Sequence, residues 1–130
     1  MKLETNESVY EHMGKMCEGW GEELMGKHGY SAVGAVVGAT YPEQLGEMRA
    51  KLPHTFFLVP GYGAQGGGAD DVKNAFDENG LGAIINSSRG IMCAWKKQGL
   101  TEEDFAVAAR KEAERMRDEI VGCIGKIKLG

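Results

Sequence analysis

Two short segments of the sequence combine residue types that could bind a phosphate group. The first runs from Pro60 to Gly68 and contains five glycines in nine residues, so its backbone N–H groups can approach a ligand closely. The second, Asn86-Ser-Ser-Arg-Gly90, offers the hydroxyls of Ser87 and Ser88 and the guanidinium of Arg89. Oriented amides bind anions, and a guanidinium can hold a phosphate through two parallel hydrogen bonds. We predict that the two segments form one phosphate pocket.

Each of these segments directly follows an apolar run that is typical of a strand. The runs lie at about 32–38, 56–59 and 81–85, and they lack polar alternation, as in parallel strands buried on both faces. Helical patterns separate them, which predicts an α/β fold with about three parallel strands. Because ligands of such folds bind at the carboxyl ends of strands, the sheet should bring both segments to one edge.

Long helices are predicted at the two ends of the chain. The first runs from about 8 to 28, and Ser8 with Glu11 forms the capping-box signature at its start. The final helix runs from about 102 to 124. Apolar stripes at helical spacing predict core-facing sides. They consist of Val9, Met13, Met16, Cys17, Trp20 and Leu24 in the first helix and of Phe105, Ala109, Ala113, Met116, Ile120 and Ile124 in the last.

Length and composition exclude several classes of protein. The 130 residues suit a single unit without a second domain. A net charge of −4 argues against a nucleic-acid partner, which would require a basic face. Three dispersed cysteines fit reduced thiols in the cytoplasm, and the three histidines lack metal-ligand spacing, so we expect no metal site. The first residues contain no signal peptide, and no run of the sequence is apolar for long enough to span a membrane.

Two further patterns could indicate other chemistry. Gly61-Tyr-Gly-Ala-Gln-Gly66 satisfies the GxGxxG pattern of a Rossmann-like dinucleotide-binding protein, but the acidic residue expected after the next strand is missing. Asp71, Lys73 and Asp77 could suggest acid–base chemistry. Since they lie on an amphipathic helix away from the strand ends, we interpret them as a solvated face.

A sheet of three parallel strands is unusually narrow. It leaves two free edges, whereas parallel sheets are normally wider and covered on both faces. We therefore expect self-association into a homo-oligomer, or association with further strands that complete the sheet.

Three strings in this order resemble one enzyme family. They are Val36-Val-Gly-Ala-Thr40-Tyr-Pro-Glu43, Phe57-Leu-Val-Pro-Gly-Tyr-Gly-Ala-Gln-Gly-Gly67 and Gly82-Ala-Ile-Ile-Asn-Ser-Ser-Arg89. The sequence from about Tyr10 to Lys97 resembles the bacterial orotidine 5′-phosphate decarboxylases. The resemblance implies the C-terminal part of a (β/α)8 TIM barrel, with its sixth, seventh and eighth strands. It also implies conversion of orotidine 5′-phosphate to UMP and CO2 without a cofactor, in pyrimidine biosynthesis.

The resemblance also implies roles for individual residues. Gln65 would reach both the phosphate and the pyrimidine, and Arg89 would bind the phosphate. Ser88 and Gly66 would offer backbone N–H groups nearby, and Pro60 would shape the loop beside the base. The expected ligand is thus a small-molecule nucleotide, orotidine 5′-phosphate or UMP.

The family's catalytic string is missing from this chain. In the family, a D-x-K-x-x-D string in the N-terminal half supplies the lysine that protonates C6, and no such string occurs here. We therefore assign no catalytic residue in this chain, expect the catalytic half of the barrel to be absent, and expect the chain alone to be inactive. The alternative is a non-catalytic, oligomeric module that binds nucleotide or phosphate.

Overall fold

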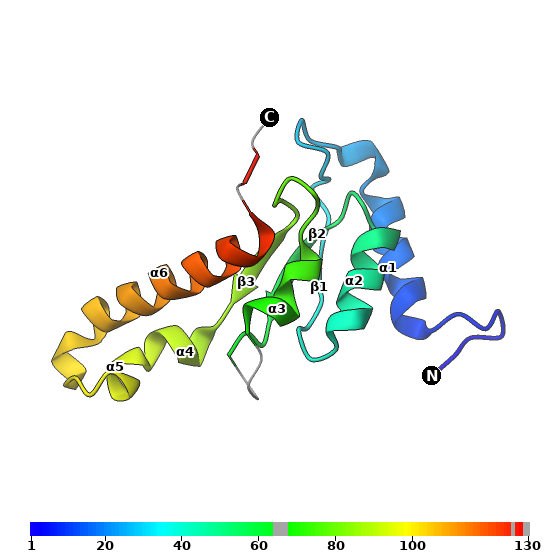
Figure 1. Cartoon of the computed structure of the whole chain (residues 1–130). Coiled ribbons are helices and arrows are strands. Elements are labelled where there is room, and N and C mark those ends of the chain that lie inside the picture. Colours follow the sequence, from blue (N-terminus) through cyan, green and yellow to red (C-terminus); the bar gives the residue numbers. More distant parts are fainter. Residues whose placement is uncertain (64–67, 126, 129–130) are drawn as a thin grey trace.

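The sheet consists of three parallel strands that follow one another in space as they do in the sequence. The computed structural model describes residues 1–63, 68–125 and 127–128. Strands β1 (Gly34–Val36), β2 (Phe56–Pro60) and β3 (Ala83–Asn86) are arranged in the order β1-β2-β3 (Figure 1). The predicted parallel sheet with alternating helices is confirmed.

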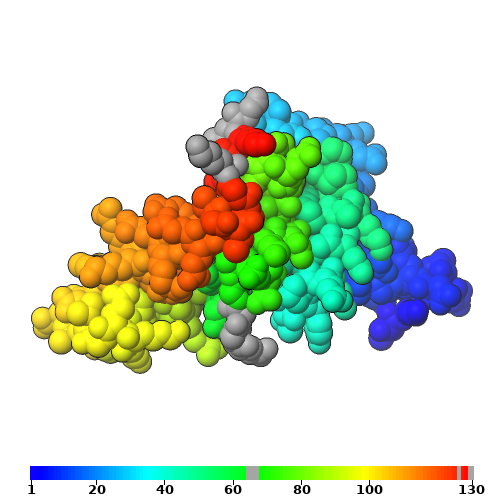
Figure 2. Space-filling model, viewed as in Figure 1, coloured from blue at the N-terminus to red at the C-terminus, as the bar shows by residue number. Residues whose placement is uncertain are grey.

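Six α-helices are found in the described part of the chain. They are α1 (Val9–Trp20), α2 (Pro42–Lys51), α3 (Ala69–Val72), α4 (Ser88–Met92), α5 (Ala94–Lys97) and α6 (Phe105–Ile124). Three short 3-10 turns accompany them, η1 (Glu22–Leu24), η3 (Lys73–Ala75) and η4 (Glu102–Asp104). Helices α4 and α5 and the start of α6 form an arm that extends from one side of the molecule, away from the N-terminal segment (Figures 1 and 2).

The hydrophobic core lies on one face of the sheet. Phe57 and Val59 of β2 are fully buried there, because strand side chains alternate between the two faces. Helices α2, α3 and α6 lie over this same face (Figure 1). Their core side chains are Leu45, Met48, Val72, Met116 and Ile120.

The opposite face of the sheet is open. Its apolar side chains are Val36, Phe56, Leu58 and Ile84, which are 69%, 39%, 40% and 58% exposed, respectively. The prediction that the strands are buried on both faces is therefore wrong for the described residues. The reason is that the helices of this chain cover only one side of the sheet.

The first helix is shorter and more exposed than predicted. Ser8 begins it as expected, and its backbone N–H donates to Glu11 Oε2 at 3.0 Å. The helix ends at Trp20 instead of continuing to about 28, because Gly19 and Gly21 have low helix propensity. The predicted core stripe is also mostly exposed, at Met13, Met16, Trp20 and Leu24.

The buried face of α6 differs from the predicted one in its first half. Phe105 is 57% exposed and Ala113 is also exposed, whereas Ala108 is fully buried. The first turns of α6 pack against α4 and α5 in the arm, beyond the sheet, so a different side faces inward. In the second half, Met116 and Ile120 are buried as predicted.

A buried arginine ties the amino ends of the strands together. Arg49 of α2 donates to the carbonyl oxygens of Gly82 at 3.0 Å and Thr55 at 2.7 Å, and also to that of Leu52. Its guanidinium lies 4.1 Å from the ring centroid of Phe57. Since Thr55 and Gly82 immediately precede the β2 and β3 regions, one side chain fixes the start of both strands. Burial lowers the pKa of Arg49.

Tyr30 and Asp77 complete this cluster. The Tyr30 hydroxyl donates to Asp77 Oδ2 at 2.7 Å, and burial raises the pKa of Tyr30 to about 12. Gly82 adopts a φ of +100°, and a Cβ there would collide with the Tyr30 hydroxyl. A side chain at position 82 would therefore disrupt the cluster as well as strain the backbone.

Candidate functional site

The two segments predicted to bind phosphate leave the sheet side by side. β2 ends at Pro60 and β3 ends at Asn86, and these two residues are register partners. The glycine-rich loop begins directly after Pro60, and Ser87 follows Asn86. The parallel pairing thus brings the two strand ends together, as the sequence predicted.

A buried tyrosine anchors the start of the glycine-rich loop. The Tyr62 side chain is only 5% exposed, and its hydroxyl donates to a carboxylate oxygen of Glu119 on α6. Burial, followed by this hydrogen bond, raises the pKa of Tyr62 to about 12. The loop is therefore tied to the last helix just before its predicted ligand-binding residues. Two of these, Gln65 and Gly66, lie outside the described residues.

A serine joins the loop to the end of β3. The Ser87 hydroxyl is buried and donates to the carbonyl oxygen of Tyr62 at 3.0 Å. A Cβ at Gly90 would collide with the Ser87 hydroxyl oxygen, so the first turn of α4 can approach Ser87 only with glycine at that position. Ser87 therefore has a structural contact and is not free to reach a ligand.

Ser88 and Arg89 lie exposed at the start of α4. Ser88 is the first residue of this helix, and its hydroxyl accepts a hydrogen bond from Asn86 Nδ2 at 3.2 Å. Both side chains are exposed, next to the paired strand ends. The arrangement leaves a guanidinium and a helix-start N–H group at the edge where the glycine-rich loop begins.

The last residue of the glycine-rich loop is hydrogen-bonded to a carboxylate of α3. The Gly68 N–H donates to Asp71 Oδ2 at 2.8 Å at the start of α3. This amide is therefore occupied by a side chain of the protein. Any anion-binding amides of the loop must come from residues other than Gly68.

The sequences of known proteins identify the relatives of this chain. No family model matches it. The orotidine 5′-phosphate decarboxylase of Clostridium tetani is 47% identical over 116 residues, which are 89% of this chain and 40% of that protein. The enzyme of the same name from Rhodopirellula baltica is 50% identical over 102 residues, 78% of this chain and 32% of its own length. The chain is homologous to the C-terminal part of orotidine 5′-phosphate decarboxylases.

Solved structures agree with this homology. A putative orotidine-monophosphate decarboxylase from Toxoplasma gondii matches 97% of this chain and 46% of its own, with a TM-score of 0.72 and 26% identity. A UMP synthase from Leishmania donovani matches 92% of this chain and 24% of its own, with a TM-score of 0.67 and 32% identity. The chain thus has the fold of part of a decarboxylase TIM barrel and spans about two fifths of the length of the Clostridium tetani relative.

The residues weighed for acid–base chemistry have separate partners. Lys73 pairs with Asp70 at 3.0 Å, and Asp71 binds the Gly68 amide. Asp77 accepts the hydrogen bond from Tyr30 at the amino ends of the strands, away from the paired ends of β2 and β3. The structure therefore does not bring Asp71, Lys73 and Asp77 together as one site.

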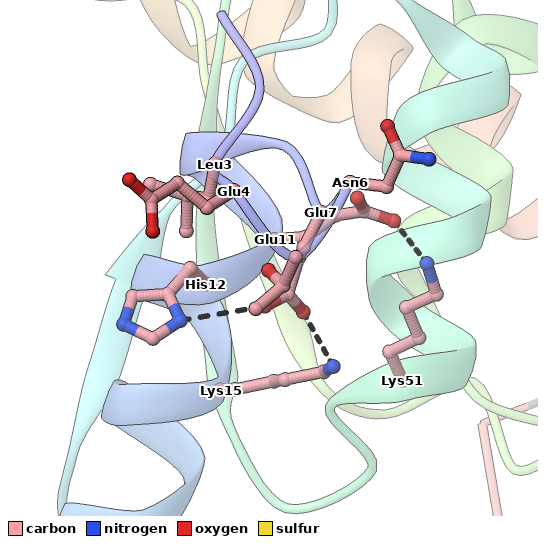
Figure 3. A pocket seen from close by; sticks show the side chains of 9 residues that line it. Leu3, Glu4, Asn6, Glu7, Glu11, His12, Lys15 and Lys51 are labelled. Atoms are coloured by element: carbon pink, nitrogen blue, oxygen red, sulfur yellow. Dashed lines mark hydrogen bonds and ion pairs between the residues drawn. The ribbon is translucent and has the colours of Figure 1, made fainter.

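A hollow near the N-terminus is lined by several ionisable side chains (Figure 3). Lys15 and His12 point toward Glu7, with a distance of 3.3 Å between His12 Nδ1 and Glu7 Oε2, and Lys51 of α2 pairs with Glu11 of α1. The opposite charges satisfy one another and join α1 to α2. We interpret this cluster as structural.

The described residues contain neither a metal-binding cluster nor a membrane-spanning helix. In the ranges 1–63, 68–125 and 127–128, no group of three or more His, Cys, Asp or Glu side chains could hold a metal ion. No helix in the same ranges is long and apolar enough to cross a membrane.

Sequence reasoning missed Arg49, Tyr30 and Glu119. Arg49 could have been found, because it lies four residues after Leu45 on the apolar stripe of α2, where a charged side chain must be buried. Tyr30 and Glu119 give no such local signal, because their partners Asp77 and Tyr62 are 47 and 57 positions away in the sequence.

Proposed function

We propose that this chain binds the phosphate group of a pyrimidine nucleotide, orotidine 5′-phosphate or UMP, as the phosphate-binding part of a decarboxylase. The observation that carries the proposal is the pairing of Pro60 with Asn86, from which the chain continues into the start of the glycine-rich loop and into exposed Ser88 and Arg89, respectively. The names of the relatives support the nucleotide as the ligand.

Each predicted residue has a role in this proposal. The Arg89 guanidinium binds the phosphate through charged hydrogen bonds, and the Ser88 N–H at the start of α4 donates a further one. Gly66 donates a backbone N–H, and Gln65 reaches both phosphate and pyrimidine. Pro60 shapes the start of the loop beside the base.

The chain alone is proposed to bind without catalysing decarboxylation. Its sequence contains no D-x-K-x-x-D string, so the proton donor and the charged array expected around the reacting carbon are missing. Binding energy from a remote phosphate accelerates a reaction only when groups at the reacting carbon use it in the transition state. Catalysis would therefore require residues from a further polypeptide segment.

The chain is also proposed to act as one unit within a larger assembly. Both edges of its sheet lack a strand partner among the described residues, and one sheet face is open. Assembly would cover this apolar surface, either with further copies or with the strands that complete a barrel.

A calorimetric titration with UMP tests the proposed site. Loss of a charged hydrogen bond in Arg89→Ala should cost roughly 1.5–3 kcal/mol, which corresponds to a roughly ten- to hundred-fold weaker UMP affinity. The control Arg110→Ala removes another exposed arginine, on α6, and should bind UMP like the wild type. Uridine, which has no phosphate, should bind equally to the wild type and to Arg89→Ala.

Four results would contradict the proposal. Equal UMP affinity of the wild type and Arg89→Ala would remove Arg89 from the site, and no UMP binding would show that the chain alone forms no site. Saturable NAD binding without preference for UMP would favour a dinucleotide-binding protein. Turnover of orotidine 5′-phosphate by the pure chain would contradict the proposed inactivity.

A further inference from the structure

Tyr62 is hydrogen-bonded to two other segments through opposite ends of the residue. Its hydroxyl donates to a carboxylate oxygen of Glu119 on α6, and its carbonyl oxygen accepts a hydrogen bond from the Ser87 hydroxyl at 3.0 Å. Tyr62 is 5% exposed and Ser87 is 8% exposed, and leaving a polar group unpaired in such a place is costly. One buried residue therefore connects α6 to the end of β3.

The Ser87 hydroxyl joins two segments instead of capping its own helix. A serine directly before a helix usually accepts a hydrogen bond from an N–H group of the first turn. Within the described part of the chain, Ser87 makes no such side-chain bond, and its hydroxyl donates to Tyr62. The Ser87 carbonyl oxygen accepts from the Ile91 N–H at 3.0 Å, at the start of α4. The position of Tyr62 therefore sets where α4 begins.

Arg89 depends on this backbone for its placement. It is the second residue of α4, two positions after Ser87, and its side chain is exposed. The direction of the guanidinium is therefore set by the backbone of α4 and not by packing around the side chain. Because charged hydrogen bonds require close donor–acceptor distances, a displaced start of α4 would weaken those that Arg89 makes to a phosphate.

Glu119 is held in place on α6 by a neighbouring arginine. Arg115 pairs with Glu119 and also with Glu112, with a distance of 2.6 Å between Arg115 Nη2 and Glu112 Oε1. Helix α6 packs against α4 as well (Figure 1). The carboxylate that accepts the Tyr62 hydroxyl is thus restricted in position by its own helix.

We propose that Tyr62 is a positioning residue for phosphate binding: with Glu119 at its hydroxyl and Ser87 at its carbonyl oxygen, it holds Arg89 where the phosphate is bound. Tyr62 contributes through Arg89, because both of its hydrogen-bonding groups are bonded to the protein. The inference rests on the proposed nucleotide binding and adds to it a residue that selects for the phosphate group.

UMP titrations test this role. Tyr62→Phe and Ser87→Ala each remove one hydroxyl, and each should weaken UMP affinity roughly three- to tenfold, as expected for the loss of one hydrogen bond. The affinity for uridine should be the same in both variants as in the wild type, since uridine carries no phosphate. In an Arg89→Ala background, Tyr62→Phe should cause no further loss, because the tyrosine acts through the arginine.

Further variants separate positioning from stability. Tyr30→Phe also removes a tyrosine hydroxyl that is bonded to a carboxylate, that of Asp77, and it should lower stability without changing UMP affinity. Glu119→Gln retains an oxygen that can accept from Tyr62 and should bind UMP like the wild type, whereas Glu119→Ala should resemble Tyr62→Phe. Circular dichroism checks that each variant is folded, and Ser87→Ala tests the same connection if Tyr62→Phe is not.

Hydrogen exchange of the chain without ligand gives a measurement that does not depend on UMP. The Ile91 amide should exchange roughly threefold faster, or more, in Tyr62→Phe and Ser87→Ala than in the wild type and Tyr30→Phe. Equal Ile91 exchange in all four proteins would overturn the inference.

The titrations distinguish failure of this inference from failure of the proposed function. A wild type that binds UMP while Tyr62→Phe binds it equally well contradicts only the positioning role. The same holds if Tyr30→Phe weakens UMP binding as much as Tyr62→Phe. A wild type that binds no UMP contradicts the proposed function, and the inference fails with it.

Discussion

At the scale of single residues, Arg49 contributes most clearly to the fold. Its guanidinium donates to carbonyl oxygens from the end of α2 and from the residues before β2 and β3. Leu52, Thr55 and Gly82, whose oxygens accept these bonds, are buried residues. Removing the side chain therefore leaves several acceptors unsatisfied, in addition to the lost packing on Phe57.

We expect Arg49→Ala to lower the free energy of unfolding by about 3 kcal/mol or more, as measured by urea denaturation. Arg49→Lys should restore only part of the loss, because an ammonium group cannot reproduce the planar fork of donors. Arg110→Ala, which breaks an exposed pair with Glu114, should change stability by no more than about 0.5 kcal/mol. A similar loss in both alanine variants would show that Arg49 does not hold the strands together.

At the scale of elements, β2 shows how one strand separates two environments. Phe57 is fully buried against the helices, while its neighbour Phe56 is 39% exposed on the open face. Phe56 contacts Tyr30 edge to face, with a distance of 5.9 Å between ring centroids. The two residues are chemically identical, so any difference between their contributions to stability arises from their positions.

We expect Phe57→Ala to lower the free energy of unfolding by about 3–5 kcal/mol, because it leaves a cavity in the core. Phe56→Ala should cost no more than about 1.5 kcal/mol, through the partial loss of the aromatic contact. Urea denaturation of both variants measures the difference. Equal losses would mean that the open face is covered in the protein in solution.

The same elements show what the sequence could predict. Strand existence and order follow from apolar runs separated by helical patterns, and the paired strand ends follow from parallel topology. The open face could not be predicted, because Val36, Leu58 and Ile84 are as apolar as Phe57 and Val59. Apolar residues indicate that a sheet face is suited to burial. They do not indicate whether helices of the same chain pack against that face. The exposed stripe of α1 was misassigned as core for the same reason.

The candidate site was predictable only in part. Glycine-rich and Ser-Ser-Arg segments have local signatures, so their position at the strand ends could be anticipated. The different roles of Ser87 and Ser88 could not be predicted. They depend on which hydroxyl reaches the Tyr62 carbonyl oxygen across the strand ends. The role of Glu119 depends on how α6 folds back over the loop.

At the scale of the whole molecule, several carboxylates make stability depend on pH. The hydrogen bond from Lys51, together with those from Ser8, lowers the pKa of Glu11 to about 2. Burial acts to raise the pKa of Asp77, but hydrogen bonds from Tyr30 and from the Leu81 and Asn79 amides outweigh it, and the pKa lies below 3.8. Glu11 joins α1 to α2, and Asp77 joins Tyr30 to the segment that precedes β3.

We expect the free energy of unfolding to fall as the pH decreases from about 4.5 toward 2. The pKa values of Glu11 and Asp77 are lower in the folded state than in the unfolded state. Their ionised carboxylates therefore stabilise the fold fully at a pH above the unfolded-state pKa values. This contribution to the free energy of unfolding is lost as the pH falls through the folded-state pKa values. Urea denaturation at pH 7, 4 and 3 measures the decrease. Glu11→Gln should reduce the pH dependence, and equal slopes in the wild type and this variant would contradict the explanation.

The order of the sheet also has a kinetic consequence. β1, β2 and β3 pair in the order in which they occur in the sequence. Each strand is therefore separated from its partner only by the helical segment between two consecutive strands. Each pairing therefore closes a shorter loop, and loses less chain entropy, than a pairing between strands that are not consecutive. Helix α6 follows the three strands in the sequence, and it covers the core and binds Tyr62 through Glu119. The start of the glycine-rich loop at Tyr62 is therefore anchored only after α6 has formed.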